Sequence, residues 1–160
     1  MESTHPLNLN LRQVISCLTG VLSQVEAQKI EEELRRNVRQ ALRLSETHLR
    51  SARAMNSWRN VVSRGYYCCY CASRAIRLAE TGIFSTETDD HKKVGNLPAG
   101  FPNRAVWSDV LTKFRADRNL GDYDHTARPR NLEYSSGKYL VFAGDFLNEA
   151  KRYLRARGII

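Results

Sequence analysis

The side chains of this sequence that could do chemistry lie where an apolar helical stripe becomes polar. The apolar part of the stripe consists of Trp107, Leu111 and Phe114, which recur at helical spacing. Further turns of the same helix would bring Arg118, Asp122 and His125 to that face, within roughly 60° of one another. The spacing therefore predicts one converging polar face, provided that the helix continues to His125.

An arginine and a histidine on one face could cleave RNA. A histidine changes its protonation near neutral pH, so it can take a proton from a ribose 2′-hydroxyl, while an arginine is always charged and can hold the phosphate. Burying both groups would cost free energy unless they were paired or opened onto a groove. A groove between two subunits would satisfy this requirement.

The same spacing has a purely structural interpretation. Arg118 and Asp122 are four residues apart, so they could form an ion pair along one helix. His125 could simply end that helix, where a positive charge interacts favourably with the helix dipole. A single arginine with a single histidine is a weak motif, and the spacing by itself leaves both interpretations open.

Amphipathic patterns indicate the helices that must position these residues. The expected spans are residues 31–54, a helix from Asn56 or Ser57 to Glu80 that Gly82 closes, a third helix from Trp107, and a fourth from Asn131 or Ser135 to Arg157. Residues 82–104 are expected to form a loop with one short helical turn. Because no alternating strand pattern occurs, the sequence predicts an all-α fold, an up-and-down bundle of four main helices.

Two further expectations concern how the chain is divided and packed. Residues 1–25 are expected to be an N-terminal extension with a short helix, and residues 26–160 the bundle. The second helix carries small apolar residues around most of its circumference, so other helices can approach it closely and it should be central. Its three cysteines, Cys68, Cys69 and Cys71, and the distant Cys17 do not have zinc-site spacing, so we expect reduced thiols and no metal.

Composition favours one folded domain that meets an anionic partner. The chain has 160 residues, 42% of them hydrophobic, and a formal net charge of +8. Such a charge favours nucleic acid or an acidic protein surface, although lysines and arginines that merely solvate helix faces explain it equally well. The N-terminal sequence lacks a secretory signal, and its apolar run is too short to span a bilayer. We therefore expect a cytoplasmic protein without a membrane partner.

Three segments resemble the HEPN domain family. Residues 63–75 (SRGYYCCYCASRA) resemble the family's second-helix signature, in which a small residue and paired tyrosines precede further small residues. Residues 89–94 (DDHKKV) are similar to the histidine stretch between its helices, and residues 118–125 (RNLGDYDH) to its Arg-x₄₋₆-His motif. The resemblance covers roughly residues 35–157, whereas the first 25 residues have no counterpart and could bind a partner.

The resemblance implies a metal-independent ribonuclease without a cofactor. Arg118 and His125 match the catalytic pair of such family members, in which two subunits pair to form one composite site and cleavage leaves a cyclic phosphate. Asn119 and Asp122 match variable motif positions and are expected to support that pair. The implied assembly is a homodimer through the face that carries Arg118 and His125.

The motif also resembles the toxin half of HEPN and minimal nucleotidyltransferase pairs. In those pairs the partner blocks the toxin by adding nucleotide to a motif tyrosine, and Tyr123 occupies the matching position. An RNA endonuclease toxin is therefore the first interpretation. The alternative is a non-catalytic HEPN module that binds a nucleotide or docks a nucleotidyltransferase, in which Arg118 and His125 are structural. Of the other histidines, His5 and His48 are expected at the surface, and His91 is the only one retained as a further catalytic candidate.

Overall fold

Four long helices form the bundle in the computed structural model, which describes residues 22–82 and 88–160. They are α2 (Gln24–Ala54), α3 (Trp58–Thr81), α4 (Arg104–Tyr123) and α5 (Ser136–Ala156), joined by the short 3-10 helices η2 (Thr88–Lys93) and η3 (Pro129–Asn131). These ranges contain no strand, so the predicted all-α bundle of four main helices is confirmed. The expected short helix in residues 1–25 lies almost entirely outside the described residues.

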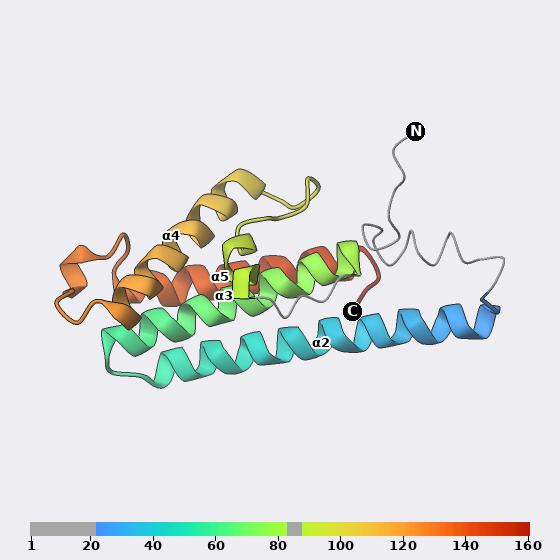
Figure 1. Ribbon diagram of the computed structural model, residues 1–160, viewed down its shortest axis with the longest axis horizontal. Coiled ribbons are helices and arrows are strands. Elements are labelled where there is room, and N and C mark those ends of the chain that lie inside the picture. The colour runs from blue at the N-terminus through green and yellow to red at the C-terminus, as the bar shows by residue number, and fades with distance from the viewer. Residues whose placement is uncertain (1–21, 83–87) are drawn as a thin grey trace.

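Helix α3 is the central element of the bundle, as its small residues predicted. It packs against α2, α4 and α5, and Figure 1 shows α2 and α5 running beside it while α4 crosses the bundle obliquely. Close approach is visible at Gly65, where a Cβ atom would meet the Tyr139 ring of α5 at 3.5 Å. Small side chains on α3 therefore allow three helices to share one core.

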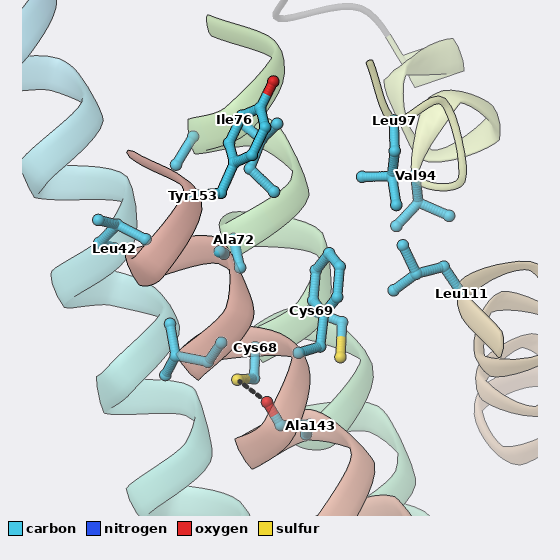
Figure 2. Close-up of a cluster of buried hydrophobic side chains, with 14 of the residues drawn as sticks. Leu42, Cys68, Cys69, Ala72, Ile76, Val94, Leu97, Leu111, Ala143 and Tyr153 are labelled. Carbon is cyan, nitrogen blue, oxygen red and sulfur yellow. Dashed lines mark hydrogen bonds between the residues drawn. The ribbon is translucent and has the colours of Figure 1, made fainter. Parts of the chain in front are cut away.

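The α3 cysteines are part of that core. Cys68, Cys69 and Cys71 are buried free thiols, so their expected place in the core is confirmed, while Cys17 lies outside the described residues. The Cys68 thiol is 3.7 Å from the Ala143 carbonyl of α5 (Figure 2). It is also 3.3 Å from the Ser45 hydroxyl of α2. Burial raises the pKa of Cys71 to about 12 and that of Cys69 well above its ordinary value, so these two thiols stay protonated.

Helix α2 begins seven residues earlier than predicted, because a capping box precedes the apolar stripe. The Ser23 hydroxyl accepts a hydrogen bond from the backbone N–H of Glu26 at 3.3 Å, and the Glu26 carboxylate accepts one from the backbone N–H of Ser23 at 2.8 Å. This reciprocal capping box fixes the start of the helix at Gln24. The other predicted boundaries of α2 and α3 hold: Ser57 precedes α3, and Gly82, at a φ of 69°, closes it.

A buried carboxylate joins α4 to the segment that leads into α5. Asp117 is 3% exposed, and it accepts hydrogen bonds from the Tyr139 hydroxyl at 2.5 Å and from the backbone N–H of Glu133 at 2.9 Å. Burial and this bond raise the pKa of Tyr139, which keeps its hydroxyl a donor. Asp117 therefore fixes the rotation of α4 about its axis, and with it the direction in which Arg118 points.

Candidate active site

Arg118 is held in one position by side chains from two helices. Its Nε lies 2.7 Å from Asp122 Oδ2, one turn further along α4. One terminal nitrogen donates to the Tyr67 hydroxyl of α3 at 3.0 Å, and the other donates to Asn119 Oδ1 at 3.1 Å and to the Tyr123 hydroxyl at 3.4 Å. These partners orient the guanidinium group before any ligand binds. Only 15% of the Arg118 side chain is exposed.

Three tyrosine rings surround the same guanidinium group. The Arg118 Cζ atom lies 5.4 Å from the ring centre of Tyr67, 5.3 Å from that of Tyr123 and 6.0 Å from that of Tyr66. The faces of aromatic rings attract cations, so these rings favour the charge of Arg118 where water is partly excluded. An anion that reached this point would meet a fixed and poorly hydrated positive charge.

Arg118 lies in a groove of about 460 Å³ between α3, η2 and α4. The residues that line it are Tyr66, His91, Lys92, Arg115, Arg118, Asn119 and Tyr123. Three of these side chains are cationic, and no carboxylate is among the described residues that line the groove. Its volume lies within the range of small-molecule sites, so it could hold a nucleotide or one phosphate of a nucleic-acid chain with its base.

The short helix η2 is anchored to α3 by Asp90. Asp90 is buried, and its carboxylate accepts two hydrogen bonds from the Arg77 guanidinium at 2.7 and 3.0 Å and a third from the Tyr70 hydroxyl at 2.8 Å. Burial would raise the pKa of Asp90, but the bonds from Arg77 and Tyr70 outweigh it, and the pKa is lowered. Asp90 therefore stays ionised and fixes the residue that follows it, His91.

His91 packs against the tyrosines of α3. Its ring stacks on Tyr70 with the ring centres 4.3 Å apart, and its Nδ1 is 2.7 Å from the Tyr66 hydroxyl. Burial, and then the positive charge of Arg118, lower the pKa of His91 below its ordinary value of 6.5. Burial also raises the pKa of Tyr66, so near neutral pH both members of this hydrogen bond are uncharged.

The structure brings most of the predicted site residues together, but His125 is not among the residues that line the groove. Arg118, Asn119, Asp122 and Tyr123 gather at the last turns of α4, whereas the helix ends at Tyr123 and His125 lies on an exposed turn after it. The single polar face was predicted on condition that the helix continues to His125, and this condition is not met. The i,i+4 ion pair of the structural interpretation is present, at 2.7 Å.

An arginine of α3 binds the backbone around the end of α4. The Arg59 guanidinium donates to the backbone carbonyls of Gly121, Asp124 and Ala127, at 2.9 Å for Asp124 and 3.1 Å for Ala127. Carbonyls at the end of a helix need partners from outside the helix, and Arg59 supplies them. Arg59 lies 62 residues before Gly121, so sequence spacing does not reveal its contact. A local signal is also present, because Asp124 Oδ1 accepts a hydrogen bond from the backbone N–H of Thr126 at 2.8 Å, which forms a turn directly after the helix.

Sequence reasoning missed the partners that Arg118 finds on α3. The sequence places Tyr66 and Tyr67 only in the segment that resembles the HEPN signature, and its spacing predicts no contact between His91 and these tyrosines. A signal was present, because two tyrosine hydroxyls in a helix of small apolar residues need hydrogen-bond partners once buried. Arg118 and His91 are those partners.

No family model, curated protein or solved structure matches this chain. The HEPN resemblance therefore remains a prediction from the motif residues quoted above. Two further observations apply to residues 22–82 and 88–160: no group of three or more His, Cys, Asp or Glu side chains could hold a metal ion, and no helix has the length and apolar content needed to cross a bilayer.

Proposed function

We propose that this protein is a metal-independent RNA endonuclease and that the groove at Arg118 binds the scissile phosphate. One observation carries the proposal: a pre-oriented guanidinium group lies in a groove with two further cations and exposed aromatic surface. Arginine matches the geometry of a phosphate, and an aromatic ring such as Tyr123 can stack on an unpaired base. A net charge of +8 would attract RNA to such a groove.

In the proposed reaction the ribose 2′-oxygen attacks the neighbouring phosphorus. Arg118 stabilises the negative charge that develops on the phosphate oxygens, and His125 transfers a proton at the attacking or the leaving oxygen. The P–O5′ bond breaks, so the products carry a 2′,3′-cyclic phosphate and a 5′-hydroxyl group. Because His125 lies on an exposed turn beyond the groove, we propose that it acts in a composite site where two copies of this face meet.

We also propose that the protein is the toxin half of a pair whose partner is a nucleotidyltransferase. The Tyr123 side chain is 69% exposed, and its hydroxyl lies 3.4 Å from an Arg118 nitrogen. A nucleotide attached to that oxygen would put a phosphate beside Arg118 and occupy the groove. Modification of Tyr123 would then prevent RNA from binding there.

A second candidate function is a non-catalytic module that binds a nucleotide in the same groove or docks a nucleotidyltransferase. The position of His125 favours it, because this side chain is exposed and lies outside the groove. Under this alternative, Arg118 binds phosphate and no bond is cleaved.

The experiment that separates the two functions is cleavage of end-labelled tRNA or total RNA in excess EDTA. We compare wild-type protein with Arg118→Ala and His125→Ala, and use Arg39→Gln, which removes an exposed charge of α2, as the matched control. Wild type and control should cut and leave cyclic-phosphate ends, and both site variants should lose cutting while remaining folded. Intact RNA with freshly expressed, unmodified wild type, together with nucleotide binding that Arg118→Ala abolishes, would favour the non-catalytic module.

A further inference from the structure

The groove contains a histidine that the sequence motif does not assign to catalysis. His91 lines the groove together with Arg118, although the two residues come from separate elements, η2 and α4. Its side chain is half-buried, and of its two ring nitrogens only Nδ1 has a hydrogen-bond partner among the described residues. The other nitrogen, Nε2, is therefore available to a ligand in the groove.

The orientation of this ring is fixed in the way that proton transfer requires. The Tyr66 hydroxyl holds Nδ1 at 2.7 Å, the Tyr70 ring packs parallel to the imidazole, and the Asp90–Arg77 ion pair fixes the backbone of η2. A general base needs a defined direction for its lone pair as well as a suitable protonation state. Contacts from α3 supply that direction for His91 before substrate arrives.

We propose that His91 is the general base of the cleavage reaction, with Nε2 accepting the proton of the ribose 2′-hydroxyl and Tyr66 holding the ring. The inference rests on the proposed ribonuclease function and divides its acid-base work between two histidines. When Nε2 takes the proton, the 2′-oxygen forms its bond to phosphorus and the P–O5′ bond breaks. The leaving 5′-oxygen keeps the electron pair of that bond and takes a proton from His125.

The surroundings of His91 suit a base better than an acid. Arg118 and Arg115 of α4 and Arg74 of α3 disfavour a positive charge on the ring, Asp90 favours one, and burial together with the arginines prevails. The neutral imidazole can be protonated on either nitrogen, and the proposal requires the form in which Nδ1–H donates to the Tyr66 oxygen. That form leaves the lone pair of Nε2 free to accept a proton.

The test measures kcat and KM against pH for cleavage of end-labelled tRNA in EDTA. His91→Gln should lower kcat by roughly a hundred- to ten-thousand-fold while KM changes little, and the acid limb of the wild-type profile, expected with a midpoint below pH 6.5, should disappear. Free imidazole should restore part of the activity of His91→Ala. Tyr66→Phe should lower kcat less than His91→Gln does, because the phenylalanine ring still packs against His91. The control is Arg39→Gln, which removes an exposed charge of α2 that does not line the groove.

Three results would overturn the inference, and they are separable from failure of the proposed function. A wild-type pH profile in His91→Gln would remove His91 from the reaction while leaving the ribonuclease intact. A loss confined to KM would make it a binding residue. A long-range ¹H–¹⁵N spectrum of wild type that shows His91 protonated on Nε2 at pH 7.5 would contradict the required form, whatever the variants do. RNA that stays intact with wild type would refute the ribonuclease and this inference together.

Discussion

Replacement of Asp90 by asparagine should destabilise the fold because it breaks a buried ion pair. The Asp90 carboxylate is 2% exposed, its partner Arg77 is 15% exposed, and Tyr70 donates a third hydrogen bond to the same group. Removing one member of a buried pair costs about 3–5 kcal/mol, because the other charge loses its partner without regaining water. Arg77 keeps some contact with solvent, so we expect Asp90→Asn to lower the free energy of unfolding by about 3 kcal/mol.

Urea denaturation at pH 7, followed by far-ultraviolet circular dichroism, measures this loss. The matched control is Asp109→Asn, which breaks the exposed ion pair that Lys113 forms at 2.7 Å along α4. An exposed pair of this kind contributes little to stability, because both charges remain hydrated and screened. If Asp90→Asn lowered the free energy of unfolding no more than Asp109→Asn, the Asp90 carboxylate would not anchor η2. The fixed orientation inferred for His91 would then be refuted.

Two further predictions concern the same anchor and the end of α4. Because the folded-state pKa of Asp90 lies below its ordinary value of 3.8, its stabilisation should be complete above that value and be lost as pH falls through the lower, folded pKa. The difference in unfolding free energy between wild type and Asp90→Asn should therefore shrink in urea titrations below about pH 4, and a difference that grew with acid would contradict the assignment. Arg59→Ala should leave the carbonyls of Gly121, Asp124 and Ala127 without their donor, cost about 1–3 kcal/mol and speed amide exchange around the end of α4, whereas unchanged exchange there would show that Arg59 does not cap it.

Local patterns were sufficient to predict the helices. The apolar stripes place the core faces of α2 and α3. Gly82 marks the end of α3, because helix closure depends on residues next to one another in sequence. The error at the start of α2 was of the same local kind. Ser23 and Glu26 are three residues apart, so the capping box could have been identified without a structure.

The candidate site depends on contacts that sequence spacing does not contain. Arg118 was identified because it interrupts an apolar stripe, but its hydrogen bond to Tyr67 joins residues 51 apart in the chain. His91 reaches the groove through η2, whose place is set by Asp90 and Arg77 rather than by any helical pattern. His125 does not reach the expected helical face because α4 ends at Tyr123, where Arg59 of another helix binds the backbone carbonyl of Asp124.

The buried thiols of α3 allow the opening of the core to be followed by chemical labelling. Cys68, Cys69 and Cys71 are 0%, 1% and 6% exposed, so a thiol-reactive dye can modify them only when neighbouring helices separate. In a Cys17→Ser background every labelled sulfur would then come from α3. Labelling kinetics would thereby time the opening of the bundle in the presence of RNA, and a mass spectrum would show which sulfur had been reached.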